Sequence, residues 1–323
     1  MKSVGIIGGS GYTGGELIRL LMHHPALDID FVYSTTRAGK PITSAHPDLL
    51  GQTQMTFTGT INPKVSVVFL CLGHGKSREF LNAHHFSDQT LMVDLGNDFR
   101  LEKENQFEGK NFIYGLPELQ KETIEKANAI ANPGCFATAI QLALLPLAKN
   151  KLLNTAIHIN ATTGSTGAGV SLSPTSHFSW RNNNLSWYKP FTHQHLDEIH
   201  RTLNQLEAPT ELFFMPQRGN FTRGIFATAY TSFEGSLESA QNFYQDFYKQ
   251  HPFTHVSSEP INLKNVVGTN NCFIHLHLHE NTLLITSCID NLIKGASGQA
   301  IQNTNLIMGW EETLGLELKA TVF

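Results

Sequence analysis

The sequence predicts an open, parallel α/β sheet domain followed by an α+β domain. A strand, a glycine-rich turn and a helix open the chain, and apolar strand segments then alternate with helical ones through the first third. Past the helix that begins near residue 135, strands alternate apolar with polar residues, as half-buried antiparallel strands do. The length of 323 residues fits about two such domains.

The first strand and helix lie in KSVGIIGGSGYTGGELIRLLMHHP. An apolar strand over 4–7 leads into the turn, and a helix follows that stops before Pro25. The spacing of glycines at 9, 11 and 14 between a strand and a helix is typical of a Rossmann domain, where a pyrophosphate sits on the helix N-terminus. The predicted dinucleotide site comprises Gly9, Ser10, Gly11, Tyr12, Thr13 and Gly14.

The end of the second strand, IDFVYSTTRAG, indicates which nicotinamide cofactor fits. An NAD site places an acid there for the ribose hydroxyl, whereas this strand runs into Ser34, two threonines and Arg37, which suit a 2′-phosphate. Asp30 lies too early, inside the strand. We therefore predict NADP(H) as the cofactor. The third strand, in VSVVFLCLGHGKS, ends at Gly73 and His74, which we expect beside it.

Two further strands, in TLMVDLGNDFRL and NAIANPGC, complete the first sheet. The second half of the chain has a different pattern of elements. Its strand segments are TAIHINATTGSTGAG, LFFMPQRG, GIFATAYTSF and NCFIHLHLHENTLLITSCID, with a helix in SLESAQNFYQDFYKQ. The tail GASGQAIQNTNLIMGW is helical again, and we expect it to return to the first domain. The expected boundaries are 1–134 plus 296–323 for the NADP-binding domain and 135–295 for a catalytic and oligomerisation domain.

Composition excludes several classes of function. A formal net charge of −4 and the lack of a long basic run argue against nucleic acid as the main partner. No segment approaches the length of uncharged apolar chain that spans a membrane, and the N-terminal residues enter a strand without a secretory signal, so we expect a cytoplasmic protein. The four cysteines show no metal-binding spacing.

One cysteine occupies a position suited to chemistry. Cys135 follows a Pro-Gly break in ANPGCFATAI and begins an apolar helical run. The free N–H groups and positive dipole end of a helix stabilise thiolate over thiol, which favours a nucleophile. Cys71 and Cys288 lie inside apolar strand segments, where burial as small hydrophobes is expected, and Cys272 fits either interpretation.

Six segments of the chain closely resemble, in the same order, segments of the N-acetyl-γ-glutamyl-phosphate reductase family, whose members act in arginine biosynthesis. They are GIIGGSGYTGGEL, DLGNDFRL, YGLPEL, NPGC, HQHLDEI and DNLIKGASGQAIQN. The resemblance implies a catalytic domain like that of aspartate-semialdehyde and glyceraldehyde-3-phosphate dehydrogenases. This chain departs from the family pattern in two places. Phe136-Ala137 stand where the family usually has Tyr-Pro after the cysteine, and Gln194 and Asp197 replace Arg and Pro beside the histidines.

The resemblance implies NADPH-dependent reduction of an acyl phosphate through a Cys135 thioester, with His195 as general acid/base. His193 and His200 flank it on the same segment and are rival bases, with His193 the stronger rival. Glu198 and Asp197 could orient the imidazole. The expected binding residues are His193, Glu198, Arg100 and Arg223 for the substrate and Asn303 for the cofactor, with Lys294 and Arg218 as further cations. No metal is expected, because His275, His277 and His279 alternate along one strand face.

Alternatives stay open at this stage. Arg181 and Lys189 could bind a succinyl carboxylate in place of an acetyl group, or be surface charges. The chain could instead reduce another acyl phosphate such as aspartyl phosphate, or be a nucleotide sensor that has lost catalysis. A homo-oligomer, dimer or tetramer, is expected from the resemblance.

Overall fold

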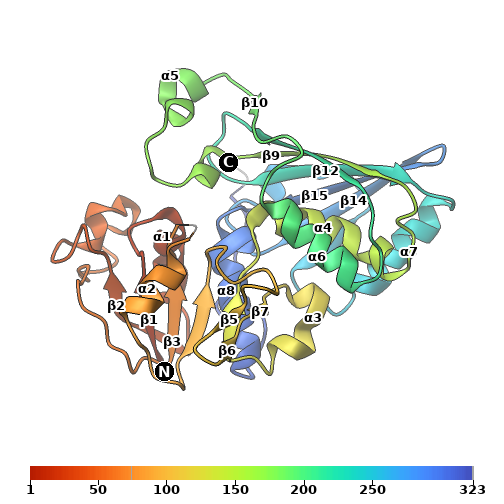
Figure 1. Ribbon diagram of the computed structural model, residues 1–323. Coiled ribbons are helices and arrows are strands. Elements are labelled where there is room, and N and C mark those ends of the chain that lie inside the picture. The colour runs from red at the N-terminus through yellow and green to blue at the C-terminus, as the bar shows by residue number, and fades with distance from the viewer. Residues whose placement is uncertain (74, 322–323) are drawn as a thin grey trace. The chain divides into compact units, whose positions relative to one another are not determined.

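The computed structural model describes residues 1–73 and 75–321 (Figure 1). The chain divides into two compact units: unit 1 comprises Met1–Pro133 and Ala296–Glu317, and unit 2 comprises Gly134–Gly295 and the residues from Leu318 onward. The predicted boundaries differ at the tail, which they assign to the first domain. Thr321 N–H donates to the Val267 carbonyl at 3.2 Å, an attachment within unit 2.

Unit 1 is a six-stranded sheet in the order β2-β1-β3-β4-β8-β7, and every neighbouring pair is parallel. The strands are β1 (Lys2–Ile7), β2 (Leu27–Tyr33), β3 (Val67–Leu70), β4 (Leu91–Asp94), β7 (Ile113–Tyr114) and β8 (Ala129–Ala131). The helices are α1 (Tyr12–Leu21), α2 (Ser77–Ala83), α3 (Pro117–Ile124) and α8 (Gly298–Ile307). The short strands β5 (Gln106–Phe107) and β6 (Lys110–Asn111) pair separately, and η1 (Ile42–Ser44) and η2 (Pro47–Leu49) follow β2. This confirms the predicted Rossmann-like sheet.

Unit 2 is a seven-stranded mixed sheet in the order β10-β11-β9-β12-β15-β14-β13. Its strands are β9 (Ile157–Thr163), β10 (Ser186–Trp187), β11 (Leu212–Arg218), β12 (Ile225–Ser232), β13 (Thr254–Ser257), β14 (Cys272–His279) and β15 (Thr282–Ile289). Its helices are α4 (Cys135–Lys149), α5 (Phe178–Arg181), α6 (His195–Gln205) and α7 (Leu237–Tyr248). Short helical turns η3 (Ser165–Ala168), η4 (Pro174–Ser176) and η5 (Leu263–Asn265) lie between strands, and η6 (Ile293–Ser297) is a π-helical turn.

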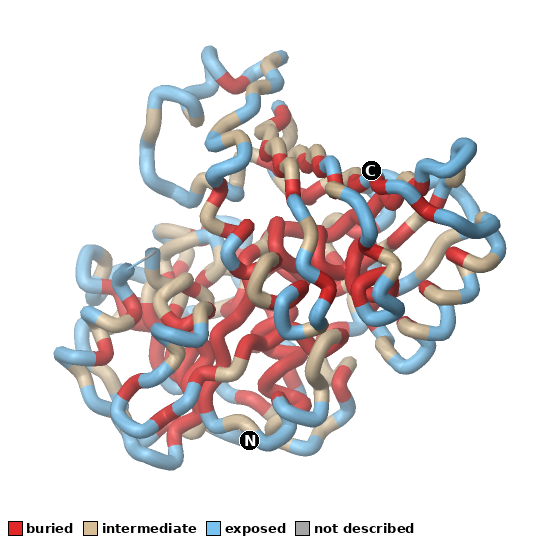
Figure 2. The backbone as a smooth tube through the Cα atoms, turned by 45° about the vertical axis from the view of Figure 1, so that its right-hand side comes forward, coloured by how far each residue is buried: buried red, intermediate tan, exposed pale blue. Residues whose placement is uncertain are grey.

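Helices α4 and α7 pack on one face of this sheet, and α6 packs on α4. Buried residues therefore alternate with more exposed ones along β9, β11 and β12 (Figure 2). Helix α4 is buried along nearly its whole length although it contains Pro146. Proline removes the hydrogen bond to the carbonyl of Leu142. The Tyr248 hydroxyl on α7 donates to that carbonyl, which repairs the loss.

None of the helices among the described residues is long and apolar enough to cross a membrane.

Candidate active site

The glycine-rich turn of unit 1 is packed on its inner side and open on its outer side. Gly8 adopts φ +77° after β1. A Cβ on Gly9 would stand 2.1 Å from Val32 Cγ1, and one on Gly14 would stand 2.6 Å from Gly9 Cα, so both positions require glycine. Around Gly11, the N-cap of α1, the nearest atom to an added Cβ is the Gly8 carbonyl oxygen at 3.7 Å. This open space at a helix N-terminus fits a dinucleotide pyrophosphate.

The residues predicted to read the cofactor's ribose lie at the end of β2. Ser34 is buried, with its hydroxyl 3.3 Å from that of Ser10 in the turn. Arg37 is half-buried and donates to the Ser44 carbonyl at 3.1 Å. Gly73 is exposed after β3, and His74 lies outside the described residues. The side chains at the end of β2 suit a 2′-phosphate.

Asn303 is fully buried on α8, inside unit 1. Its Nδ2 donates to the Gly115 carbonyl at 2.8 Å and approaches Asn132 Oδ1 at 3.3 Å. Its Oδ1 has no hydrogen-bond partner among the described residues. A buried amide oxygen without a partner could accept a hydrogen bond from a donor on a bound molecule, and the cofactor role of Asn303 stays a prediction.

The DLGNDFRL segment, after β4, uses its charged residues to fix backbone. Asp98 accepts the N–H groups of Ser77 and Arg78 at 2.6 and 3.2 Å and so caps α2. Arg100, predicted to bind substrate, is buried and donates to the Asn132 carbonyl at 2.9 Å and to the Leu95 carbonyl at 3.1 Å.

Asp94 in the same segment is fully buried. Burial raises its pKa to about 6, against the effect of a hydrogen bond from Ser77. Its second oxygen, Oδ2, has no hydrogen-bond partner among the described residues, which leaves the charged form poorly solvated.

Cys135 begins helix α4 of unit 2, with Gly134 as its N-cap. Cys135 forms no disulfide among the described residues and is half-buried. Gly295 packs directly against it, since a Cβ there would lie 2.8 Å from Cys135 Cβ. By contrast, burial raises the pKa of the Cys71 and Cys288 thiols, which favours the unreactive neutral form; Cys288 lies in the core and Cys71 is half-buried.

Glu198 connects the start of α4 with the predicted base. Its Oε2 accepts the Gly134 N–H at 2.9 Å, and its Oε1 lies 3.9 Å from His195 Nε2. His195 and Glu198 are both buried on the first turn of α6. The imidazole lies against Gly134, where a Cβ would stand 2.3 Å from Nε2. The structure thus places His195 beside the residue that precedes the thiol, whereas Asp197 is exposed.

The His193 ring contacts other aromatic rings in the same region. The His193 ring lies edge-on to His195 at 4.6 Å between centroids, to Phe136 at 5.4 Å and to Tyr188 at 5.7 Å. His193 Nδ1 also accepts the His195 N–H at 3.2 Å, which fixes the start of α6. Phe136, one of the departures from the family pattern, therefore contacts the histidine pair without removing a reacting group.

The predicted cations of unit 2 differ in their partners. Arg223 pairs with the fully buried Asp290 through two hydrogen bonds of 3.1 and 3.2 Å. Lys189 is exposed and donates to Gln194 at 3.2 Å. Lys294 is fully buried, 5.8 Å from the Phe253 ring centroid. Arg181 is buried, which argues against the alternative that it is a surface charge.

Two family models match the chain: the semialdehyde dehydrogenase NAD binding domain over residues 3–127, and the semialdehyde dehydrogenase dimerisation domain over 135–291. A curated N-acetyl-γ-glutamyl-phosphate reductase from Flavobacterium johnsoniae is 64% identical, with 100% of both chains covered. The chain belongs to the N-acetyl-γ-glutamyl-phosphate reductase family. Another member, from Christiangramia forsetii, is 56% identical over 100% of both chains.

Solved aspartate-semialdehyde dehydrogenases share the fold of this reductase-family chain. That of Vibrio cholerae, complexed with ASA, has a TM-score of 0.70 at 15% identity and covers 96% of this chain and 98% of its own. That of Candida albicans, with NADP, has a TM-score of 0.69 at 15% identity and covers 95% and 98%.

Sequence reasoning missed several features of the site in this reductase-family chain. Asp290 accepts, besides Arg223, the backbone N–H groups of Gly268, Leu292 and Ile293 at 2.8 to 3.1 Å. An acid directly after the strand in LLITSCID was the available signal. His46 was not singled out, although its Nε2 lies 2.7 Å from the Gly9 carbonyl oxygen. No spacing pattern in the sequence predicts a contact between two residues that lie 37 positions apart.

Proposed function

We propose that this chain reduces N-acetyl-γ-glutamyl phosphate with NADPH, giving N-acetylglutamate 5-semialdehyde and phosphate. The observation that carries the proposal is the arrangement at the start of α4, where Glu198 holds both the N-cap of Cys135 and the imidazole of His195. An acyl phosphate needs only a nucleophile and a proton carrier to form a thioester.

In the first step Cys135 Sγ bonds to the acyl carbon, and phosphate leaves with the electron pair of the broken C–O bond. The thiol proton goes to His195, whose imidazolium the Glu198 carboxylate stabilises from 3.9 Å. The N-terminus of the 15-residue helix α4 favours the thiolate before attack.

NADPH, when bound, supplies the hydride that reduces the thioester carbonyl. The resulting thiohemiacetal oxygen exchanges its proton with His195, and the C–S bond breaks to release the aldehyde and the Cys135 thiolate. The glycine turn supports binding of the pyrophosphate, and the absence of an acid from the residues directly after β2, together with Arg37, supports NADP over NAD.

An acetyl group is the better fit for the acyl position than succinyl. Arg181 donates to the carbonyls of Thr175 and Asn184 in its own loop and of Arg218 at the end of β11, so its hydrogen bonds are satisfied within unit 2. Lys189 points to Gln194 at the surface. A small neutral group needs no cation.

The deciding experiment is the reverse assay with N-acetylglutamate 5-semialdehyde, phosphate and NADP. Wild type should produce NADPH only when phosphate is present, and Cys135→Ala should abolish turnover while NADP binding persists. Iodoacetamide should inactivate the enzyme by alkylating Cys135. A nucleotide sensor would bind NADP without turnover, and near-normal turnover of Cys135→Ala would refute the thioester mechanism. None of the four cysteines, all among the described residues, forms a disulfide, which fits a reducing compartment, and we assign the reaction to the cytoplasm.

We further propose that the chain forms a homo-oligomer through the sheet face of unit 2 that α4 and α7 do not cover. One row across that face runs through Phe213, His158, Tyr230 and Leu284 in register. The His158 ring stacks between Phe213 and Tyr230 at centroid distances of 5.1 and 5.0 Å. His158 and Tyr230 are exposed and Phe213 is half-buried, and aromatic residues in this state on a sheet face suit burial against a second copy.

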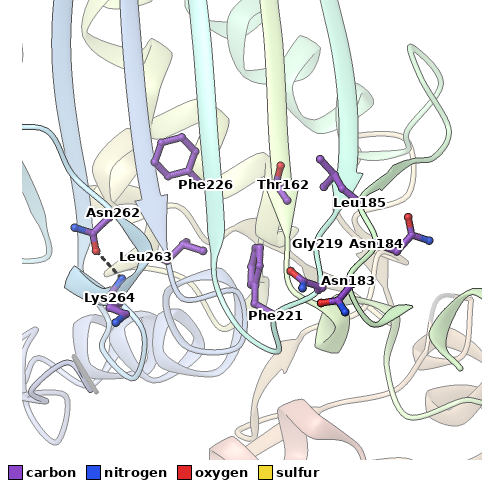
Figure 3. Close-up of a pocket in the computed structure, with 11 residues that line it drawn as sticks. Thr162, Asn183, Asn184, Leu185, Gly219, Phe221, Phe226, Asn262, Leu263 and Lys264 are labelled. Atoms are coloured by element: carbon purple, nitrogen blue, oxygen red, sulfur yellow. Dashed lines mark hydrogen bonds between the residues drawn. The ribbon is translucent and has the colours of Figure 1, made fainter. Parts of the chain in front are cut away.

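A hollow of about 900 Å³ lies at one end of this face (Figure 3). Phe226 and Thr162 come from its strands, while Asn183 and Leu185 lie across from Leu263 in the close-up. Its mixed amide and apolar lining suits a loop of a second copy.

A further inference from the structure

Two arginines of unit 2 lie close together without an acid between them. Arg181 donates through its guanidinium to the carbonyl of Arg218 at 2.5 Å. Burial, and after it the charge of Arg218, lowers the pKa of Arg181. Neither guanidinium pairs with a carboxylate among the described residues, although Arg223 in the same unit has Asp290. The pair therefore leaves an excess of positive charge that an anion would stabilise.

Each side-chain nitrogen of Arg181 donates a hydrogen bond within unit 2, whereas one nitrogen of Arg218 does not. The donors of Arg181 bond three carbonyls and the Ser186 hydroxyl. Arg218 Nε is buried and has no hydrogen-bond partner among the described residues. A buried guanidinium nitrogen without an acceptor is costly, and a ligand oxygen would remove that cost.

Arg218 contacts the aromatic cluster of Tyr188, His193 and Phe136. Its Cζ is 4.5 Å from the centroid of the Tyr188 ring, and Tyr188 contacts His193 edge-on. Burial raises the pKa of Tyr188 to about 12; the nearby charge of Arg218 opposes this rise and that of Cys135 adds to it. Tyr188 thus lies within electrostatic reach of both the guanidinium and the nucleophile.

We propose that Arg218 binds a carboxylate of the substrate, at a position distant from the carbonyl that Cys135 attacks. The inference rests on the proposed function and names a group that recognises the substrate of that reaction. The planar fork of arginine matches a carboxylate, and Tyr188 holds the fork in one plane. The carboxylate is that of the glutamyl moiety or one carried by the N-acyl group, and both have the same chemistry.

The test is steady-state kinetics in the reverse direction, because phosphate and semialdehyde are then separate substrates. Arg218→Met should raise the KM for the semialdehyde that carries the bound carboxylate by about ten- to a hundredfold, the range for a lost charged hydrogen bond. That substrate is N-acetylglutamate semialdehyde if Arg218 binds the glutamyl carboxylate, and the N-succinyl semialdehyde if it binds an acyl carboxylate. The KM for phosphate should stay within about twofold. Arg218→Lys, which retains the charge but not the fork, should give an intermediate KM and covers the case in which Arg218→Met does not fold. Lys249→Met, at an exposed position, controls for the change in net charge.

Two substrate analogues locate the carboxylate. If Arg218 binds the glutamyl carboxylate, replacing that carboxylate by a carboxamide should raise the KM of the wild-type enzyme for the analogue but leave that of Arg218→Met unchanged. If it binds an acyl carboxylate, wild type should prefer the N-succinyl semialdehyde over the N-acetyl one, and Arg218→Met should lose the preference. A rise confined to the phosphate KM, or an unchanged KM for every semialdehyde, would overturn the proposal. Failure of wild type to turn over any semialdehyde would count against the proposed function instead.

Discussion

Glu198 accounts for much of the geometry around the thiol, because one carboxylate contacts the N-cap of α4 and the base on α6. His193 differs in function from His195: its Nδ1 accepts the His195 N–H and so holds the first turn of α6. The imidazole that lies against Gly134 is that of His195. These contacts favour His195 as the proton carrier and His193 as its support.

His195→Asn should lower kcat by about a hundredfold or more, because the proton carrier is lost while the fold is kept. NADPH affinity, measured by fluorescence titration, should be unchanged. His193→Asn is the matched control and should reduce kcat less. A mild effect of His195→Asn together with a severe one of His193→Asn would exchange their roles.

Asp94 makes stability depend on pH. Its pKa in the folded state, about 6, lies above the ordinary value of 3.8, so the folded protein binds the extra proton between these values. The free energy of unfolding therefore falls as pH rises from about 4 to 6, by about 3 kcal/mol in total. Asp94→Asn should remove that loss. Urea unfolding at pH 4 to 7 should show the free energy of unfolding of the variant increasing relative to that of wild type as pH rises. A difference between the two free energies that does not change with pH would contradict the assignment.

Arg37 tests the choice of cofactor. Arg37→Ala should raise the KM for NADPH by about tenfold or more and leave that for NADH nearly unchanged, since only NADPH carries a 2′-phosphate. Lys40→Ala, an exposed cation three residues later, is the control. Equal effects of Arg37→Ala on both cofactors would mean that Arg37 does not bind the phosphate.

The sequence predicted the local structure of the candidate site where a break marked it, since Cys135 begins a helix directly after the Pro-Gly step. It could not predict the partners of cations. Arg100 and Arg181 donate to backbone carbonyls that only the folded chain brings near them. A charged residue type in a loop does not reveal whether its partner is water, a carbonyl or a ligand.

Among the elements, the dinucleotide turn is supported from behind by a distant segment. His46, between η1 and η2, is buried, and its Nε2 lies 2.7 Å from the Gly9 carbonyl oxygen. Its ring also fills the space beside Gly15, where a Cβ would lie 2.6 Å from it. A donor at Nε2 keeps the Gly9 carbonyl directed inward, so that the turn presents N–H groups rather than oxygens to a pyrophosphate.

His46→Leu should weaken NADPH binding by about tenfold, because the Gly9 carbonyl loses its donor. His46→Gln should restore much of the affinity, since its amide nitrogen can donate from a similar position. Adenosine 2′-monophosphate, which lacks the pyrophosphate, is the matched ligand, and its affinity should not change. Equal weakening of both ligands would indicate general damage to unit 1.

Element types were predicted well where a pattern was long and strongly periodic. The helix that begins at Cys135 and ends at Lys149 lies where the apolar run predicts it. The parallel pairing of β9 with β11 and of β13 with β14 was not predicted, because alternation shows which face of a strand is buried but not the direction of its neighbour.

For the whole molecule, the uncovered face of the unit 2 sheet is the proposed contact between copies. Tyr230→Glu should shift the mass measured by light scattering toward the monomer, because the row at Phe213, His158 and Leu284 would have to bury a charge. Lys249→Glu, at the end of α7 on the other side of the sheet, should leave the mass unchanged. An unchanged mass for Tyr230→Glu would place the contact elsewhere.

The ends of the 134–295 segment meet, since Gly295 packs on Cys135. A segment whose two ends lie close together can be inserted into a host domain without distorting the host backbone, because the two host residues that flank the insertion can remain near each other. This segment of unit 2 can thus be regarded as an insertion between Pro133 and Ala296, with Cys135, the proposed nucleophile, at its second residue. Exchange of this segment between relatives would move the thiol and its imidazole together and leave the Gly9–Gly14 turn with the recipient.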